Sequence, residues 1–304
     1  MAIISKIDMH VHSTASDGAS APAELVRKAK QIGLELLSIT DHDSVAGQAE
    51  AASAARDAGI HYITGVELSV MYKTHFYKDG KKGEEMHLLG YGFDPMNSAL
   101  VGALEANARY RIERARAIVD RVNEVLHGEG KEAIPYEALD EKLRTVEGAF
   151  GRQHLAAMMK ELGYVASVSE AFEKYLIGCD VPKRDISFED GSWLIKQAGG
   201  IPVLSHPETR SVTGLKVISL DREVHCAVID SMAKQQLIGG VECLYWDHDE
   251  KTAKFYEAVA GVRNLRVTGG TDHHGGNSGA GEFRERLGQH HVPDYVAQQF
   301  GVNL

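Results

Sequence analysis

Short apolar segments that end at a histidine, aspartate or glutamate recur along most of this chain of 304 residues. Seven such segments stand at residues 3–9, 36–40, 62–66, 86–91, 201–205, 241–244 and 265–270, and only those at 86–91 and 241–244 lack a polar residue directly after them. Runs of this length predict strands. Patterns with helical spacing lie between several of them, at residues 20–33, 44–58, 191–198, 221–237 and 249–260. Strands that alternate with helices predict an α/β fold of βαβ units around a parallel sheet.

The polar residues at these segments are of the types that bind metal ions. They are His10, His12, Asp17, His42, Glu67, His87, His206, Asp272 and His274. Functional residues of parallel sheets gather at the carboxyl ends of the strands, so we expect these side chains to meet. One ion takes about four to six ligands, and nine candidates therefore imply two or three divalent ions that share carboxylates. Imidazole and carboxylate without thiolate favour Mn, Fe or Zn.

The segment between residues 97 and 190 differs from the rest of the chain. It carries a long charged helix pattern at 101–127 and further helical patterns at 135–142, 152–162 and 169–176. We expect residues 1–96 and 191–304 to form one metal-binding domain, and residues 97–190 to be a helical insertion. Such an insertion can cap the site and shape substrate choice, or it can be simple decoration.

Composition narrows the function classes. With 33 Lys and Arg against 43 Asp and Glu, the formal net charge is −10, which disfavours binding to duplex nucleic acid. No apolar run approaches the length of a membrane span and no signal peptide is evident, so we expect a cytoplasmic protein with no membrane partner. The three cysteines are far apart and support no disulfide framework. The oligomeric state stays open.

Eight short motifs resemble the PHP (polymerase and histidinol phosphatase) family, in the order in which that family has them. They are Asp8-Met9-His10-Val11-His12-Ser13, Ser16-Asp17-Gly18, Ile39-Thr40-Asp41-His42-Asp43, Gly65-Val66-Glu67, His87-Leu88-Leu89-Gly90-Tyr91, Gly151-Arg152-Gln153-His154, Leu204-Ser205-His206-Pro207 and Thr271-Asp272-His273-His274-Gly275. The family's Gly-Arg-Pro-His has Gln153 in place of proline here. The resemblance implies a distorted (β/α)7 TIM-like barrel with a trinuclear metal centre.

The resemblance also implies how the ligands are shared among the ions. The first ion takes His10, His12, Glu67 and Asp272, the second Asp17, His42 and His274, and the third Glu67, His87 and His206. Asp272 and Glu67 would bridge the ions, with a metal-bound hydroxide as the nucleophile. Arg152 and His154 would contact the substrate phosphate, and His154 or a metal-bound water would protonate the leaving group. Lys183, Arg184 and Arg210 are further candidates for phosphate contacts, or else solvated surface charges.

These inferences predict a metal-dependent phosphoesterase acting on a small phosphorylated metabolite, such as a nucleoside 3′,5′-bisphosphate or a related nucleotide or ribose phosphate. One alternative is a cyclic phosphodiesterase that opens a ribose cyclic phosphate and then removes the phosphate. Another is an exonuclease that acts on the 5′ end of short RNA. A histidinol-phosphate phosphatase, an amidohydrolase and a metal-binding module without activity are weaker alternatives.

Overall fold

Two compact units make up the computed structural model, which describes residues 5–76, 83–145, 150–182, 186–209, 214–276 and 285–304. Residues 1–102 and 185–304 form the first unit, and residues 103–184 form the second. The role of the inserted segment as a cap stays a prediction.

The first unit contains nine strands among the described residues. They are β1 (Ile7–Val11), β2 (Leu36–Ile39), β3 (His61–Tyr62), β4 (Gly65–Tyr72), β5 (Glu84–Tyr91), β6 (Ile186–Ser187), β7 (Ile201–Leu204), β8 (Gly240–Tyr245) and β9 (Arg266–Gly270). A three-stranded sheet has the order β1-β2-β3, and a six-stranded sheet has the order β6-β4-β5-β7-β8-β9. The fold is therefore of the α/β class, as expected.

Strand direction differs from the expected parallel sheet at one place. β5 runs antiparallel to both of its neighbours, β4 and β7, whereas every other pair is parallel. A parallel pair needs a crossover of about a dozen residues or more, usually a helix, whereas β4 ends at Tyr72 and β5 begins already at Glu84, which suits an antiparallel pair. The strand expected at residues 62–66 is divided between β3 and β4, so Glu67 lies near the start of a strand instead of after its end.

Isolated bridges connect the two sheets. Val11 pairs with His273 beyond the end of β9, and His42 beyond β2 pairs with Glu67 of β4. The amide of His12 also donates to the carbonyl of His273 at 2.8 Å. The named strands of the described residues do not form one closed barrel, so the closed barrel is not confirmed.

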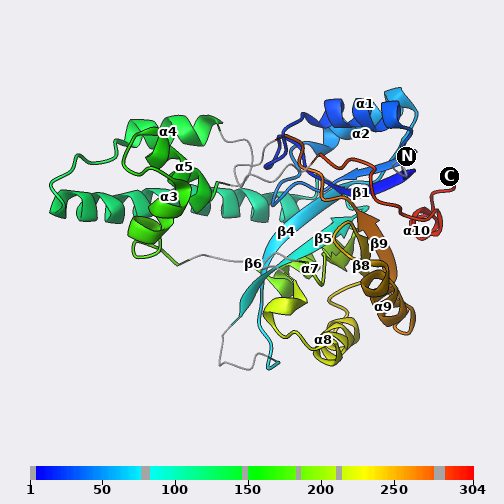
Figure 1. Cartoon of the computed structure of the whole chain (residues 1–304). Coiled ribbons are helices and arrows are strands. Elements are labelled where there is room, and N and C mark those ends of the chain that lie inside the picture. Colours follow the sequence, from blue (N-terminus) through cyan, green and yellow to red (C-terminus); the bar gives the residue numbers. More distant parts are fainter. Residues whose placement is uncertain (1–4, 77–82, 146–149, 183–185, 210–213, 277–284) are drawn as a thin grey trace. The chain divides into compact units, whose positions relative to one another are not determined.

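Helices cover the strands of the first unit (Figure 1). They are α1 (Pro22–Ile32), α2 (Gln48–Ala58), α7 (Phe188–Gln197), α8 (Arg222–Lys234), α9 (Glu250–Gly261) and α10 (Tyr295–Gln298), with a 3-10 turn at Leu215–Val217. α1 and α2 pack side by side on the three-stranded sheet, where Leu25 and Val26 of α1 join Val11 and Ile39 in one buried cluster. Full burial of an aliphatic side chain contributes about 1.5–3 kcal/mol, so this cluster anchors the strand that carries His10.

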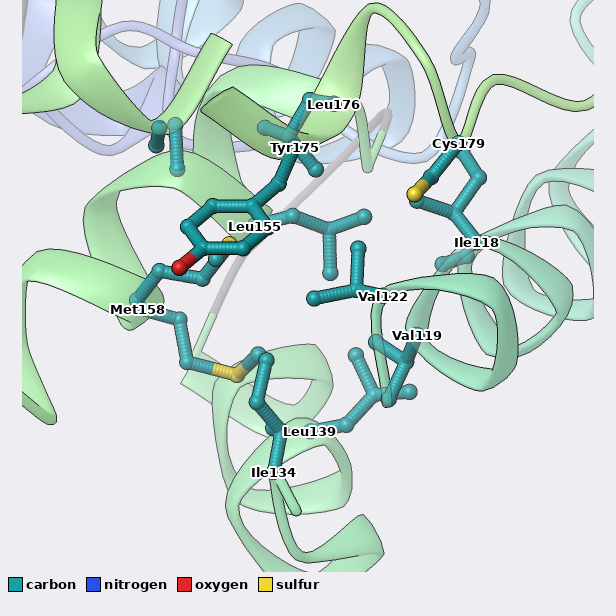
Figure 2. Close-up of a cluster of buried hydrophobic side chains, with 14 of the residues drawn as sticks. Ile118, Val119, Val122, Ile134, Leu139, Leu155, Met158, Tyr175, Leu176 and Cys179 are labelled. Carbon is teal, nitrogen blue, oxygen red and sulfur yellow. The ribbon is translucent and has the colours of Figure 1, made fainter. Parts of the chain in front are cut away.

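Helices form the second unit among the described residues. They are α3 (Ser98–Gly128), which begins in the first unit, α4 (Tyr136–Thr145), α5 (Arg152–Glu161), α6 (Val168–Ala171) and a π-helical turn at Phe172–Leu176. Figure 2 shows their own hydrophobic core, in which Val119 and Val122 of α3 lie near Leu139 of α4 and Leu155 of α5. The unit therefore buries a core of its own.

Among the helices that the structure describes, none has both the length and the apolar composition of a membrane-spanning helix.

Candidate metal centre

The first strand carries His10 and His12 into the interior of the first unit. β1 is buried along its whole length, and side chains alternate along a strand, so a spacing of two residues sends both imidazoles to one side. Both residues are fully buried. Beyond them the chain returns so closely that a Cβ on Gly18 would lie 2.1 Å from the carbonyl oxygen of His12. Glycine at this position lets the turn place Asp17 beside the pair, with 3.8 Å between Asp17 Oδ1 and His12 Nδ1.

Four ligand-type atoms converge beside β1. His10 Nε2 lies 3.2 Å from His12 Nε2 and 3.3 Å from Glu67 Oε2. Asp272 Oδ1 lies 3.1 Å from His12 Nε2 and 3.5 Å from His10 Nε2. All four atoms lie within 4.8 Å of one another, a spacing that suits a single metal ion.

A second group adjoins the first through His12. It contains His12, Asp17, His42 and His274, and its ligand atoms also lie within 4.8 Å of one another. The ring of His12 stacks on that of His274 at 4.2 Å, and Asp17 Oδ1 lies 3.3 Å from His274 Nε2. The strand pattern ends before His274, because Asp272 has a left-handed backbone with φ of 50°. Asp272 Oδ1 lies 3.5 Å from His274 Nδ1, although both residues follow the end of β9.

The third group is built around the other oxygen of Glu67. Glu67 Oε1 lies 3.0 Å from His87 Nδ1 and 3.1 Å from His206 Nε2, and these two nitrogens are 3.3 Å apart. His42 completes a group with Glu67 and His87. Glu67 thus faces one group with each oxygen, as a bridging carboxylate would.

The charges in this cluster favour a bound cation. Burial alone would raise the pKa of Glu67, but the surrounding imidazoles, His87 first, hold it well below its usual range. Burial would lower the pKa of His10, yet the carboxylates of Glu242 and Glu67 outweigh burial and hold it well above 6.5. Burial and the neighbouring imidazoles lower the pKa of His12 to about 3, so this ring is neutral and offers a lone pair.

Unpaired nitrogen atoms in the same cluster also favour a bound cation. Within the described part of the chain, the buried Nδ1 atoms of His12 and His206 have no hydrogen-bond partner. Buried polar atoms are almost always paired with protein, water or an ion. The donor set and its unpaired atoms therefore fit divalent metal ions, and the structure brings all nine candidate side chains of the first unit into one cluster.

Several buried groups around the cluster were not expected from the sequence. Glu242 of β8 contacts His10 Nδ1 at 2.8 Å, and the hydroxyl of Tyr245 donates to Asp272 at 2.9 Å. Ser205 donates to Glu67 at 2.9 Å. A carboxylate within an otherwise apolar strand was the one signal that could have indicated Glu242.

Two further aspartates of the sequence motifs, Asp41 and Asp8, accept hydrogen bonds from structural partners. Asp41 accepts hydrogen bonds from the amide and hydroxyl of Ser13 and from the hydroxyl of Ser16. Asp8 accepts from the amide and hydroxyl of Thr271 and from the amide of Gly288, and burial raises its pKa to about 6. Both carboxylates hold together the loops that carry the candidate ligands.

The expected substrate-binding residues belong to the second unit or lie outside the described residues. Arg152 opens α5, forms an ion pair with Asp180 at 2.9 Å and lies over the ring of Phe172. His154 accepts a hydrogen bond from the amide of Gly151 at 3.0 Å, which caps the start of the same helix. Lys183, Arg184 and Arg210 lie outside the described residues. The roles of all five stay predictions.

The chain is similar in sequence to several known proteins. The model of the PHP domain matches residues 8–136. A 5′-3′ exoribonuclease from Haemophilus influenzae is 33% identical over 69% of this chain and 71% of that protein. The chain belongs to the PHP family. Another PHP relative, a 3′,5′-nucleoside bisphosphate phosphatase from Chromobacterium violaceum, is 34% identical over 67% of each protein. These relatives confirm the predicted enzyme class, a hydrolase of phosphoester bonds in the PHP family.

Other PHP relatives match more of the chain. A phosphoribosyl 1,2-cyclic phosphate 1,2-diphosphodiesterase from Eggerthella lenta is 28% identical over 88% of this chain and 94% of that protein. A structure from Bifidobacterium adolescentis has a TM-score of 0.68 at 23% identity and covers 96% of this chain and 94% of its own, which shows the shared fold. A structure from Chromobacterium violaceum, described as an amidohydrolase with bound sulfate and no metal, has a TM-score of 0.67 at 30% identity and covers 91% and 90%.

Proposed function

We propose that this chain is a metal-dependent phosphoesterase that hydrolyses a small phosphorylated metabolite at the cluster around Glu67. The observation that carries the proposal is the convergence of imidazoles and carboxylates in a chain of the PHP family: eight of the nine candidates form three adjoining groups, and His206 joins them through Glu67. Divalent ions in such sites polarise phosphoryl oxygens and make water acidic enough to attack at neutral pH.

The donor set supports two or three ions of Mn, Fe or Zn. His10, His12 and Asp272 would hold one ion together with one oxygen of Glu67, and His87 and His206 would hold another with its second oxygen. The remaining ion would take Asp17, His42 and His274, with His12 close by. Imidazole and carboxylate ligands without a thiolate suit these metals.

The sign of the charge at the site favours an anionic substrate. Three divalent ions would bring +6 against −3 from Asp17, Glu67 and Asp272, so the site would be locally cationic in a protein whose net charge is −10. Arg152 and His154 would add phosphate contacts, because a guanidinium fork matches phosphate oxygens and an imidazole can donate a proton. Asp272, in contact with both His12 and Tyr245, would keep its carboxylate oriented toward the reacting groups.

A nucleoside 3′,5′-bisphosphate is the substrate class we favour, in line with the activity of the Chromobacterium relative. The Haemophilus relative supports a second candidate, removal of nucleotides from the 5′ end of short RNA. The net charge of −10 disfavours long polymers. The Eggerthella relative keeps a ribose cyclic phosphate among the substrates to be tested.

A distorted seven-stranded barrel is the finer architecture that we propose for the first unit. The bridges from Val11 to His273 and from His42 to Glu67 support it, because they join the edges of the two sheets beside the candidate ligands. Within this proposal the second unit acts as a cap for substrate choice.

Hydrolysis by the metal-loaded protein tests the function, measured as inorganic phosphate and, for RNA, as released mononucleotides. The substrates are nucleoside 3′,5′-bisphosphates, sugar phosphates, ribose cyclic phosphates and short RNA with a 5′ phosphate, each with Mn, Fe or Zn. We expect release that chelation abolishes and that Glu67→Gln lowers strongly, whereas His61→Ala, a change at an exposed histidine, leaves it intact. Lack of release from every substrate would overturn the proposal, and release from short RNA alone would favour the second candidate.

A further inference from the structure

A buried glutamate stands next to the metal centre without belonging to the nine candidate ligands. Glu242 lies in the middle of β8 and is fully buried, as are its neighbours Val241 and Cys243. Burial of a charged carboxylate is costly unless it is paired and hydrogen-bonded. In this apolar strand, the carboxylate of Glu242 therefore requires partners that pair with it or donate hydrogen bonds to it.

Both oxygens of Glu242 accept hydrogen bonds from the metal centre. Oε1 lies 2.8 Å from His10 Nδ1, and Oε2 accepts from the backbone amide of His206 at 2.8 Å. The hydroxyl of Ser205, which donates to Glu67 at 2.9 Å, lies 3.4 Å from Oε2. One carboxylate thus connects groups that face two different metal positions.

We propose that Glu242 is a positioning residue of the metal centre, which holds the imidazole of His10 by Nδ1 so that Nε2 faces the ion. An ionised carboxylate only accepts hydrogen bonds, so His10 Nδ1 must carry the proton and Nε2 is left as the metal-binding nitrogen. The same carboxylate ties the backbone of His206 to His10. This inference rests on the proposed function, because it assigns a role toward the same ions.

The geometry requires a carboxylate and excludes the amide of the same size. Glutamate presents two accepting oxygens, one to His10 Nδ1 and one to the amide of His206. Glutamine presents one oxygen and one NH₂ group, so the NH₂ group of Glu242→Gln would face one of the two donors. His10 would then lose its fixed tautomer, or the segment at His206 would lose its anchor.

Metal affinity of the full chain tests this role, measured for Zn²⁺ by competition with a chromophoric chelator. We expect Glu242→Gln to weaken the tightest-bound ion by about tenfold to hundredfold, the size found when a group that orients a ligand histidine is removed. The control is Glu250→Gln, which changes an exposed carboxylate on α9 that pairs with Lys254. Its metal affinity should match that of the unchanged protein.

A combined variant separates positioning from general stability. In a His10→Ala background, Glu242→Gln should weaken metal binding less than it does in the unchanged protein, because the part of its effect that passes through the imidazole of His10 is already missing. Equal loss in both backgrounds, or unchanged Zn²⁺ affinity in the single variant, would overturn the proposal. An unchanged protein that binds no Zn²⁺ would instead overturn the proposed function, and this inference with it.

A measurement on the unchanged sequence covers the case in which Glu242→Gln does not fold. In ¹⁵N NMR of the Zn²⁺-loaded protein, with His10 assigned from the spectrum of His10→Ala, Nδ1 should carry the proton. A His10 ring protonated at Nε2 in that state would overturn the proposal.

Discussion

His10 Nε2 and His12 Nε2 face each other at 3.2 Å, and both residues are fully buried. Two protonated imidazoles at this distance would repel each other strongly in a buried site. The pKa of about 3 keeps His12 neutral, so at most one proton stands between the two nitrogens. A divalent ion would satisfy both lone pairs and the facing oxygens of Glu67 and Asp272 at once. The pair is therefore the most sensitive place at which to test metal binding.

The amount of metal bound per chain should fall further when His12 is replaced than when His87 is replaced. His12 belongs to two of the three groups of ligand atoms, and His87 belongs to one. We expect His12→Ala to lower the metal bound per chain at two positions and His87→Ala at one, measured by elemental analysis after gel filtration. His61→Ala, at an exposed position of β3, is the control and should keep all bound metal. Equal loss from the His12 and His87 variants would contradict the shared role of His12.

The positions of the candidate ligands could be predicted from the sequence because they follow local patterns. Polar residues after apolar runs mark strand ends, and the eight motifs stand in the order in which the PHP family has them. The direction of the strands was harder to predict from the sequence than the positions of the candidate ligands. Glu67 lies near the start of β4, and the antiparallel pairing of β4 with β5 places His87 opposite Ser69, a register that the pattern within either strand does not determine.

Residues that act through others could not be predicted from local patterns. The contacts of Glu242 with His10 and Ser205 form only because the fold places β8 beside the segments that carry those two residues. In the same way, the pairing of Arg152 with Asp180 depends on how the helices of the second unit pack. Sequence spacing within one element carries no information on such contacts.

Gly18 should tolerate no side chain. A Cβ there would lie 2.1 Å from the carbonyl oxygen of His12, so Gly18→Ala must move the turn that carries Asp17. We expect a loss of about 1–3 kcal/mol in the free energy of unfolding, measured by urea denaturation, and less metal bound. Gly102→Ala is the matched control, because nothing lies within 4 Å of a Cβ there, and in helix α3 it should gain about 0.5–1 kcal/mol. Similar stability for both variants would contradict the packing at Gly18.

His225 should make the first unit sensitive to mild acid. Its Nδ1 lies 2.7 Å from the hydroxyl of Tyr256 and its Nε2 lies 2.7 Å from the carbonyl of Ser219, and burial lowers its pKa below 6.5. At this residue the unfolded chain binds more protons below about pH 6.5, so the contribution of His225 to the free energy of unfolding falls as the pH drops through that range. His225→Gln should reduce this slope, by at most about 1.4 kcal/mol per pH unit, in urea denaturation of the metal-free protein. An unchanged slope would show that His225 is not the titrating group.

Arg152 should affect substrate binding without affecting the metal. It pairs with Asp180 and lies over Phe172, so its guanidinium is held in a defined orientation within the second unit. If it contacts a substrate phosphate, Arg152→Ala removes a charge-assisted hydrogen bond of about 1.5–3 kcal/mol, and kcat/KM should fall by about tenfold to hundredfold.

A second arginine of the same unit is the control for this variant. Arg116 is exposed and pairs with Asp140, so Arg116→Ala removes an equal charge from the second unit and should leave kcat/KM within about twofold. Metal content should be unchanged in both variants, because neither arginine is among the candidate ligands. An equal fall in kcat/KM for both would indicate a general electrostatic effect of the second unit, and an unchanged value for Arg152→Ala would remove Arg152 from the substrate contacts.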